Sequence, residues 1–299
     1  MNILVSGSSG LIGQSLMPVL TSGGHRVTCL VRFQPRGGES AVYWNPAGQV
    51  MDATTLEGFD AVVHLAGEPV TGRWTAAKKR AIRESRVRGT RLLCEALARL
   101  SHRPRVLVAA SASGYYGDCG GEALREESNA GSSFLSQVCR EWEEATKPAA
   151  ESGIRVVNLR IGFVLSPAGG GLAKMLPAFR MGAGGKIGSG KQYLSWIAID
   201  DLVQIISFAS TSEALNGPAN ASAPNPGTNW EFTKTLGRVL GRPTIFPMPS
   251  FAVRLAFGEM GEELLLASTR MEPARLLSAG YHFRFPELEG ALRHLLRRG

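Results

Sequence analysis

Cysteine is scarce in this sequence, and its distribution argues against a metal centre. The 299 residues include four cysteines, Cys29, Cys94, Cys119 and Cys139, and none of them forms a CxxC pair. No group of cysteines and histidines has the spacing of metal ligands. Cys29 falls in a predicted strand and Cys94 in a predicted helix, where a free cysteine behaves as a small apolar residue. We therefore expect no bound metal.

Long apolar runs are also absent. No stretch approaches the roughly 18–20 consecutive apolar residues that a membrane span requires. The chain opens on a short apolar strand instead of the basic and apolar segments of a secretory signal. Apolar residues still make up 44% of the chain, which is enough to build a core. We therefore expect a cytoplasmic protein that does not bind membranes.

A concentrated block of positive charge is missing as well, although 33 Lys and Arg residues outnumber 25 Asp and Glu residues. Nucleic-acid-binding proteins gather such charges on one face or along one segment. Here the basic residues are scattered, apart from short groups such as Lys78 to Arg80 and Arg297 to Arg298. We expect no nucleic-acid partner, because an anionic cofactor or substrate accounts for part of the formal net charge of +8.

The most informative pattern that is present lies at the amino terminus. Residues 2–5 are typical of a buried strand, glycines follow at Gly7, Gly10 and Gly13, and residues 14–20 have a helical pattern. In a dinucleotide-binding turn the glycines permit a sharp turn, close approach of the pyrophosphate and packing of the helix on the strand. The helix N-terminus binds the phosphates. The alternative is an ordinary glycine-rich turn, since the spacing is GxxGxxG rather than GxGxxG.

The end of the second predicted strand indicates which dinucleotide this site takes. Residues 26–32 form that strand, which ends in Arg32, and no acidic residue follows before Glu39. An acidic side chain here binds the ribose 2′-hydroxyl of NAD, whereas a guanidinium forms charge-assisted hydrogen bonds with the 2′-phosphate of NADP. The sequence therefore predicts NADP(H), with a solvated surface arginine as the alternative.

Strand and helix patterns continue to alternate through the first two thirds of the chain. Apolar strands are predicted near residues 61–67, 106–111 and 156–165, with helices at 74–100 and 134–151 between them. This alternation predicts an α/β fold with a doubly wound parallel sheet of the Rossmann type. Ligands in such sheets bind at the carboxyl ends of the strands.

The periodic pattern weakens near the carboxyl terminus, after Asn216. We predict two units on this basis. The first is a Rossmann domain formed by residues 1–165 and 193–211, and the second is a small, mostly helical substrate-side unit formed by residues 166–192 and 212–299.

Two further features of the sequence carry expectations. The glycine-rich stretch at 169–191 is expected to be a mobile loop in which Lys186 and Lys191 face an anionic ligand. It contains no GxxxxGK[ST] motif, so a nucleoside triphosphate site is not supported. His64 stands inside an apolar strand, and we expect it to be a hydrogen-bonded structural residue rather than an acid or base.

Eight segments, taken in order, carry a family resemblance over nearly the whole chain. They are ILVSGSSGLIG, VVHLAGEPV, RVRGTRLL, SGYYGD, LRIGFVLS, GGKIGSG, LSWIAIDDL and LNGPANASAPNP. As an ordered set they resemble the extended short-chain dehydrogenase/reductases. More narrowly, they resemble the atypical epimerase family proteins, related to NAD-dependent epimerases and dehydratases, that carry a short carboxy-terminal domain of unknown function.

The resemblance implies that NADP(H) binds to the Rossmann domain. Matched position by position, it implies cofactor contacts from Gly7, Ser8, Ser9, Gly10, Leu11, Ile12, Arg32, Leu65, Ala66, Gly67, Arg86, Ser111 and Val164.

The chain departs from the resemblance where chemistry is performed. Active members carry a YxxxK pair, in which the lysine lowers the pKa of the tyrosine and the tyrosine transfers the substrate proton. None of the five tyrosines here has a lysine four residues later. In the helix where the pair is expected, the residues nearest to its two positions are Phe134, Leu135, Val138 and Cys139. None of them fits the role of the tyrosine or of the lysine. Ala112 stands where a serine that polarises a carbonyl is expected.

Two functions therefore stay open. In the first, the protein is an NADP(H)-dependent oxidoreductase or epimerase acting on a small molecule, with Ser113 and either Tyr115 or Tyr116 as relocated catalytic groups. The alternative for these tyrosines is aromatic packing. In the second, the protein binds NADP(H) without efficient turnover and acts as a regulatory partner or scaffold. The sequence specifies neither the substrate nor whether the chain is a monomer or a homodimer.

Overall fold

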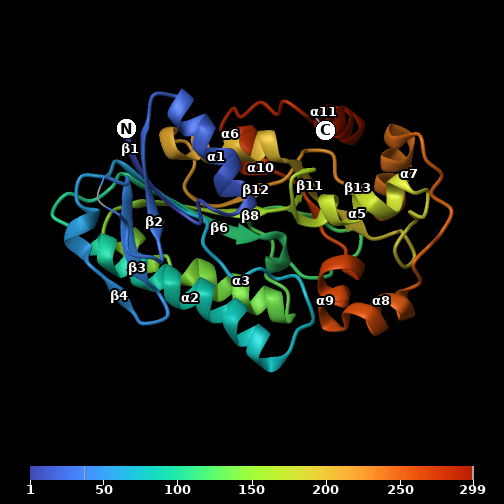
Figure 1. Ribbon diagram of the computed structural model, residues 1–299, viewed down its shortest axis with the longest axis horizontal. Coiled ribbons are helices and arrows are strands. Elements are labelled where there is room, and N and C mark those ends of the chain that lie inside the picture. Colours follow the sequence, from blue (N-terminus) through green and yellow to red (C-terminus); the bar gives the residue numbers. More distant parts are fainter. Residues whose placement is uncertain (37, 298–299) are drawn as a thin grey trace.

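The computed structural model describes residues 1–36 and 38–297. In it, the short apolar runs of the chain assemble into one central sheet (Figure 1). In spatial order its strands are β12, β8, β6, β5, β1, β2, β3 and β4. Their bounds are β1 Asn2–Ser6, β2 Arg26–Val31, β3 Ala41–Asn45, β4 Val50–Met51, β5 Ala61–His64, β6 Val106–Ala112, β8 Arg155–Ile161 and β12 Gly217–Ala221. All neighbours are parallel except β3 and β4, which are antiparallel. The predicted α/β class with a doubly wound sheet is confirmed.

Helices cover both faces of this sheet because its strands are apolar on both sides. Side chains of β1 alternate between two cores, with Ile3 and Val5 in one and Leu4 in the other. The first core includes residues of α1 (Leu11–Ser22) and α6 (Ile199–Thr211). The second includes residues of α2 (Ala76–Ala98) and α4 (Lys147–Glu151). Burial of each large apolar side chain contributes roughly 1.5–3 kcal/mol.

The helix predicted over residues 134–151 is two helices in the structure, α3 (Phe134–Glu144) and α4. Pro148 lies in the first turn of α4, where its missing N–H costs little. Pro148 has no N–H to donate to the carbonyl of Glu144 four residues earlier, which interrupts the helical hydrogen bonding between α3 and α4. The Ser133 side chain caps the start of α3. Figure 1 shows α3 beside α2, on the same side of the sheet.

The strand predicted over residues 156–165 is also divided. Gly162 separates β8 from β9 (Phe163–Leu165), which leaves the central sheet and pairs with β11 (Trp196–Ala198). A Cβ atom at Gly162 would lie only 2.5 Å from the carbonyl oxygen of Ser195, so the two segments cross there closely. The segment before β11 forms a second short strand, β10 (Tyr193–Leu194), which pairs with β13 (Gly227–Thr228).

Strand β12 is an element of the central sheet that the sequence pattern does not predict. Its residues, GPANA, have poor strand propensity, yet they extend the central sheet by pairing with β8. Proline is compatible with this position because β12 is an edge strand. Residues 217–221 thus lie in the central sheet, although the predicted two-unit division assigns them to the smaller unit. That division stays a prediction.

The carboxyl-terminal region is mostly helical, as predicted. It contains α7 (Asn229–Leu240), α8 (Ser250–Phe257), α9 (Glu259–Gly261), a π-helical turn at Glu262–Leu266, α10 (Ala274–Ser278) and α11 (Leu288–Arg297). Strand β14 (Arg270–Met271), which precedes α10, pairs with β7 (Ala123–Leu124). Short 3₁₀ helices cover Ala53–Leu56 and Ser113–Tyr115. Across the described residues, no helix is both long and apolar enough to cross a membrane.

The expectation of a mobile loop over residues 169–191 is wrong for its first half. Residues Gly170–Arg180 form helix α5, which buries Leu172, Leu176 and Phe179. The glycines at its start and Pro177 inside it obscure the helical signal, because both residue types have low helix propensity. The apolar side chains at spacings of four and three residues are what fold it onto the core.

Candidate functional site

The glycine turn at the amino terminus has the geometry of a dinucleotide-binding turn. Gly7 has a φ of +71°, and a Cβ atom there would lie 2.8 Å from the backbone carbon of Leu65. A Cβ atom at Gly13 would lie 2.3 Å from the carbonyl oxygen of Gly7, so only glycine permits this contact between helix and turn. Among the described residues no side chain caps α1, whose N-cap is Gly10. The N–H groups and the positive dipole end of the helix are therefore available for an anion.

A buried chain of hydrogen bonds joins this turn to the end of β5. Ser6 Oγ accepts hydrogen bonds from the N–H groups of Leu65 (3.1 Å) and Ala66 (3.3 Å), so it donates its own proton to Nδ1 of His64 at 2.7 Å. Nε2 of His64 then carries the ring proton and donates to Thr90 Oγ1 at 3.0 Å. These bonds fix the backbone at the ends of two adjacent strands, where the cofactor contacts are predicted.

His64 is structural, as expected from the sequence. Its side chain is fully buried, and burial lowers the pKa of the imidazole to about 4. Thr90 Oγ1 also accepts a hydrogen bond from Nε1 of Trp142 at 2.9 Å, which continues the chain to α3. A neutral imidazole whose two nitrogens are both engaged has no free position for substrate chemistry.

Arg32 follows β2 directly, at the carboxyl edge of the sheet. Its side chain is exposed, and within residues 1–36 and 38–297 it makes no hydrogen bond or ion pair. The nearby acidic residue Glu39 is engaged instead by the backbone N–H of Arg36 at 3.1 Å. Arg32 thus follows the strand that pairs with β1, and β1 leads into the glycine turn.

Arg86 lies against the end of β5. Its Nη1 donates to the carbonyl oxygens of Glu68 at 2.9 Å and Ile82 at 3.2 Å, and its guanidinium stacks over the ring of Trp142 at 5.0 Å. A Cβ atom at Gly67 would lie 3.3 Å from Cζ of Arg86, so the glycine makes room for the guanidinium. Burial lowers the pKa of Arg86 from its usual value. The predicted contacts Gly67 and Arg86 are therefore brought together.

The end of β6 carries the predicted catalytic residues. The Ser111 hydroxyl donates to Oε1 of Glu143 at 2.7 Å. Ser113 and Tyr115 lie in the 3₁₀ turn that follows, both partly exposed, and in the described part of the chain neither hydroxyl has a hydrogen-bond partner. Neither hydroxyl is therefore committed to a bond within the described residues.

Tyr116 occupies a different environment. Its side chain is 1% exposed, and its hydroxyl bonds to the Arg125 carbonyl (3.0 Å), Asn220 Oδ1 (2.7 Å) and Nη1 of Arg160 (3.0 Å). Burial raises the pKa of Tyr116 to about 12. This geometry gives the predicted catalytic role of Tyr116 no support, because a hydroxyl saturated inside the protein does not reach a substrate.

A buried ion pair, which the sequence pattern does not predict, supports this edge of the sheet. Arg160 in β8 forms two hydrogen bonds of 2.9 Å with Glu143 in α3, and its side chain is 3% exposed. Its guanidinium also lies 3.4 Å from the centroid of the Tyr115 ring. In the sequence, this pair could be found from Arg160, a charged residue inside an apolar strand, because a buried charge requires a partner.

The face of α3 on which the family resemblance places the YxxxK pair is apolar here. Leu135, Val138 and Cys139 are all buried, and burial raises the pKa of the Cys139 thiol to about 12. A thiol in that state is protonated near neutral pH and carries no charge with which to assist a tyrosine. Val164, the last predicted cofactor contact, lies in β9 and is partly buried.

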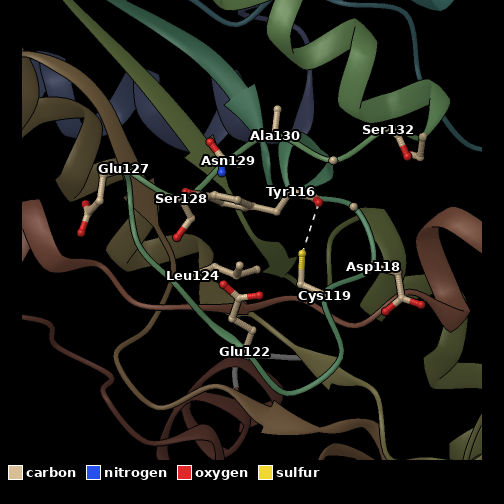
Figure 2. A pocket seen from close by; sticks show the side chains of 13 residues that line it. Tyr116, Asp118, Cys119, Glu122, Leu124, Glu127, Ser128, Asn129, Ala130 and Ser132 are labelled. Carbon is tan, nitrogen blue, oxygen red and sulfur yellow. Dashed lines mark hydrogen bonds between the residues drawn. The ribbon is translucent and has the colours of Figure 1, made fainter.

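A cavity of about 550 Å³ opens in the loop that follows the predicted catalytic residues. It is lined by residues between Tyr116 and Ser133, with Cys119, Glu122 and Leu124 on one side and Ser128, Asn129 and Ala130 on the other (Figure 2). The Cys119 thiol donates to the carbonyl oxygen of Tyr116 at 3.3 Å. Burial and nearby acidic groups raise the pKa of this thiol, so it is not activated as a nucleophile.

Comparison with known proteins identifies the family to which the chain belongs. Residues 3–220 match the NAD dependent epimerase/dehydratase family, and residues 248–295 match a domain of unknown function, DUF1731. The epimerase family protein Mb2239 of Mycobacterium bovis is 43% identical over 97% of this chain and 96% of its own length. The human epimerase family protein SDR39U1 is 35% identical over 99% of this chain and its whole length.

A solved structure of the human relative extends the comparison to three dimensions. The crystal structure of human epimerase family protein SDR39U1 (isoform2) with NADPH is similar with a TM-score of 0.91, 34% identity and 99% coverage of both chains. The solved structure of UDP-N-acetylglucosamine 4-epimerase from Bacillus cereus, at 17% identity and a TM-score of 0.77, shares the fold. The chain belongs to the NAD dependent epimerase/dehydratase family.

Proposed function

We propose that this protein binds NADP(H) at the carboxyl edge of its sheet. The observation that carries the proposal is the pairing of a glycine turn that excludes any Cβ atom with an unpartnered guanidinium, Arg32, on the adjacent strand. The pyrophosphate lies at the N-terminus of α1 and the 2′-phosphate meets Arg32. The human relative solved with NADPH supports the same assignment.

We further propose that the protein is an oxidoreductase acting on a small carbonyl compound or the corresponding alcohol. NADPH, when bound, would supply the hydride that the carbonyl carbon accepts. The Tyr115 hydroxyl would donate the proton that completes the alcohol. Ser113 donates a hydrogen bond to the carbonyl oxygen. The Arg160 guanidinium lies over the Tyr115 ring and helps to hold that ring in position.

A second function is favoured by one specific observation. The position of the missing lysine lies on a buried apolar face of α3, and Cys139 there remains a neutral thiol. A protein that lacks this cation and still binds NADP(H) fits a regulatory or scaffold role, in which cofactor binding rather than turnover is the output.

Turnover distinguishes the two functions. NADPH-loaded protein is offered a panel of aldehydes, ketones and sugar nucleotides, and cofactor oxidation is followed. The oxidoreductase proposal predicts a substrate whose turnover falls at least tenfold in Tyr115→Phe, with NADPH affinity unchanged. Tight NADPH binding without oxidation on any member of the panel supports the regulatory function, and turnover that survives Tyr115→Phe contradicts the role of Tyr115.

A further inference from the structure

A second cavity lies apart from the cofactor site, between the start of α7 and the segment that leads from α7 to α8. It is about 170 Å³ in volume and is lined by Lys186, Trp230, Thr233, Lys234, Thr244, Ile245 and Pro247. In Figure 1 this region is at the right, where the chain leaves α7 and descends to α8. None of these residues belongs to the predicted NADP(H) contacts. A cavity of this volume suits a single ring and excludes a dinucleotide.

The charged groups that line this cavity are cationic. They are Lys186 and Lys234, and no carboxylate of a described residue joins them. Within the part of the chain that the structure describes, neither lysine forms an ion pair. Lys186 is half-buried, and its Nζ donates only to the carbonyl oxygen of Ser189 at 3.3 Å. Two ammonium groups without an acidic partner create a positive potential that favours an anion.

The backbone of the glycine-rich segment holds Lys186 in place. A Cβ atom at Gly190 would lie 3.0 Å from Cδ of Lys186 and 3.2 Å from Cβ of Trp230, so this glycine lets the lysine stem pack beside the tryptophan. Gly190 also has a φ of +76°, which other residues rarely adopt. The conformation of this segment therefore positions a lysine that the sequence predicts to face an anion.

The remaining walls are apolar or carry hydroxyl groups. Trp230 is 51% exposed, and Ile245 and Pro247 are exposed beside it. Lys234 Nζ lies 6.0 Å from the centroid of the Trp230 ring. Thr233 is 1% exposed, and its hydroxyl oxygen has no hydrogen-bond partner among the described residues. The cavity therefore offers the Trp230 ring and apolar surface next to the two lysines.

We propose that this cavity is a second binding site, for a small organic anion. The acid group of the ligand lies between Lys186 and Lys234, and its ring or other apolar body rests on Trp230 and Pro247. The inference is independent of the reaction proposed above, because it uses none of the residues of the cofactor site.

Calorimetry on the full chain, with NADPH present at saturation, tests this proposal. The probes are benzoate, phenyl phosphate, inorganic phosphate and the uncharged benzyl alcohol. We expect benzoate or phenyl phosphate to bind, and inorganic phosphate and benzyl alcohol to bind at least tenfold more weakly. Lys186→Gln and Lys234→Gln should each reduce the affinity at least fivefold. Lys191→Gln, an exposed lysine of the same segment outside the cavity, is the matched control and should bind as the unaltered protein does.

The proposal would be overturned if neither aromatic anion bound at about 10 mM. It would also be overturned if benzyl alcohol or inorganic phosphate bound as tightly as the aromatic anions, or if both cavity variants kept the affinity of the unaltered protein. Competition between NADPH and the probe would place the probe in the cofactor site and also overturn it. The lysine variants are expected to unfold at the same temperature as the unaltered protein, since neither lysine forms an ion pair among the described residues.

Discussion

Arg32 is the residue on which cofactor choice depends. Its guanidinium is exposed and unpartnered in the described structure, so its charge is not committed to the fold. Charge-assisted hydrogen bonds contribute about 1.5–3 kcal/mol each, which corresponds to a tenfold to hundredfold change in affinity. Removing them should therefore affect NADPH and spare NADH.

We expect Arg32→Glu to weaken NADPH binding by at least tenfold without weakening NADH binding, as measured by titration calorimetry. Arg26→Glu is the matched control, because Arg26 is an exposed arginine at the opposite end of the same strand. Equal weakening of both cofactors, or an equal effect of the two substitutions, would contradict the role of Arg32.

Tyr115 and Tyr116 are adjacent in the chain, but their side chains lie in different environments. The Tyr116 hydroxyl has three partners, whereas that of Tyr115 has none in the described residues. We expect Tyr116→Phe to lower the free energy of unfolding by about 1–3 kcal/mol, because it leaves buried polar groups unpaired. Tyr115→Phe should lower it by less than about 0.5 kcal/mol, as is usual at less buried positions. Denaturant unfolding measures both, and equal losses would contradict the assignment.

His64 makes the free energy of unfolding fall as the pH becomes acidic. Its pKa is lowered from 6.5 to about 4 in the folded protein, so the unfolded chain takes up a proton at a higher pH than the native one. Its contribution is fully present above pH 6.5 and is lost as the pH falls to 4. The loss is about 3 kcal/mol for a shift of this size.

Denaturant unfolding at a series of pH values tests this expectation. His64→Gln should show a flatter decline in unfolding free energy over the same range, because it retains an amide that can hydrogen-bond and has nothing to titrate. A native imidazole that titrates near its ordinary pKa by NMR would contradict the structural role of His64 even if the variant failed to fold.

At the level of elements, α1 and the glycine turn before it act as one unit. Gly13 allows the helix to touch the turn at a distance that no Cβ atom permits. Overpacking at such a contact costs about 1–3 kcal/mol and displaces the backbone. The same displacement moves the N–H groups that the phosphates require.

We therefore expect Gly13→Ala to lower both the unfolding free energy and the NADPH affinity, the latter by at least tenfold. Gly290→Ala in α11 is the control, because a Cβ atom added there would meet nothing within 4 Å and its φ lies outside the left-handed region. That change should stabilise the protein by about 0.4–1 kcal/mol. Unchanged NADPH affinity in Gly13→Ala would contradict the proposed position of the pyrophosphate.

Local sequence pattern predicts the elements that form the Rossmann core and misses those that depend on distant partners. β1, β5 and β6 are apolar enough on both faces to be recognised as buried strands. β12 has the residues of a loop and becomes a strand only because β8 offers an unpaired edge. Helix α5 has the local composition of a loop, because its glycines and proline outweigh its buried leucines.

The same distinction applies to the site. The turn at Gly7 and the position of Arg32 follow from spacing along a short segment. The burial of Tyr116 does not, because its partner Asn220 is 104 residues away and Arg160 is 44 residues away. Hydrogen bonds over such separations are set by the assembled sheet rather than by local pattern.

For the molecule as a whole, ligand binding and stability are linked. A ligand that binds only the folded state at a hundredfold excess over its Kd adds about 2.7 kcal/mol to the free energy of unfolding. NADPH should therefore raise the unfolding temperature more than NADH does at the same concentration. In Arg32→Glu this difference should disappear.

Selective binding of NADPH by the intact chain is the property from which the proposed function follows, and titration calorimetry at ordinary ionic strength measures it. We predict one site per chain with a micromolar or lower Kd and an affinity for NADH at least tenfold weaker. No heat with NADPH at millimolar concentration, or equal affinity for the two cofactors, would contradict the proposed function.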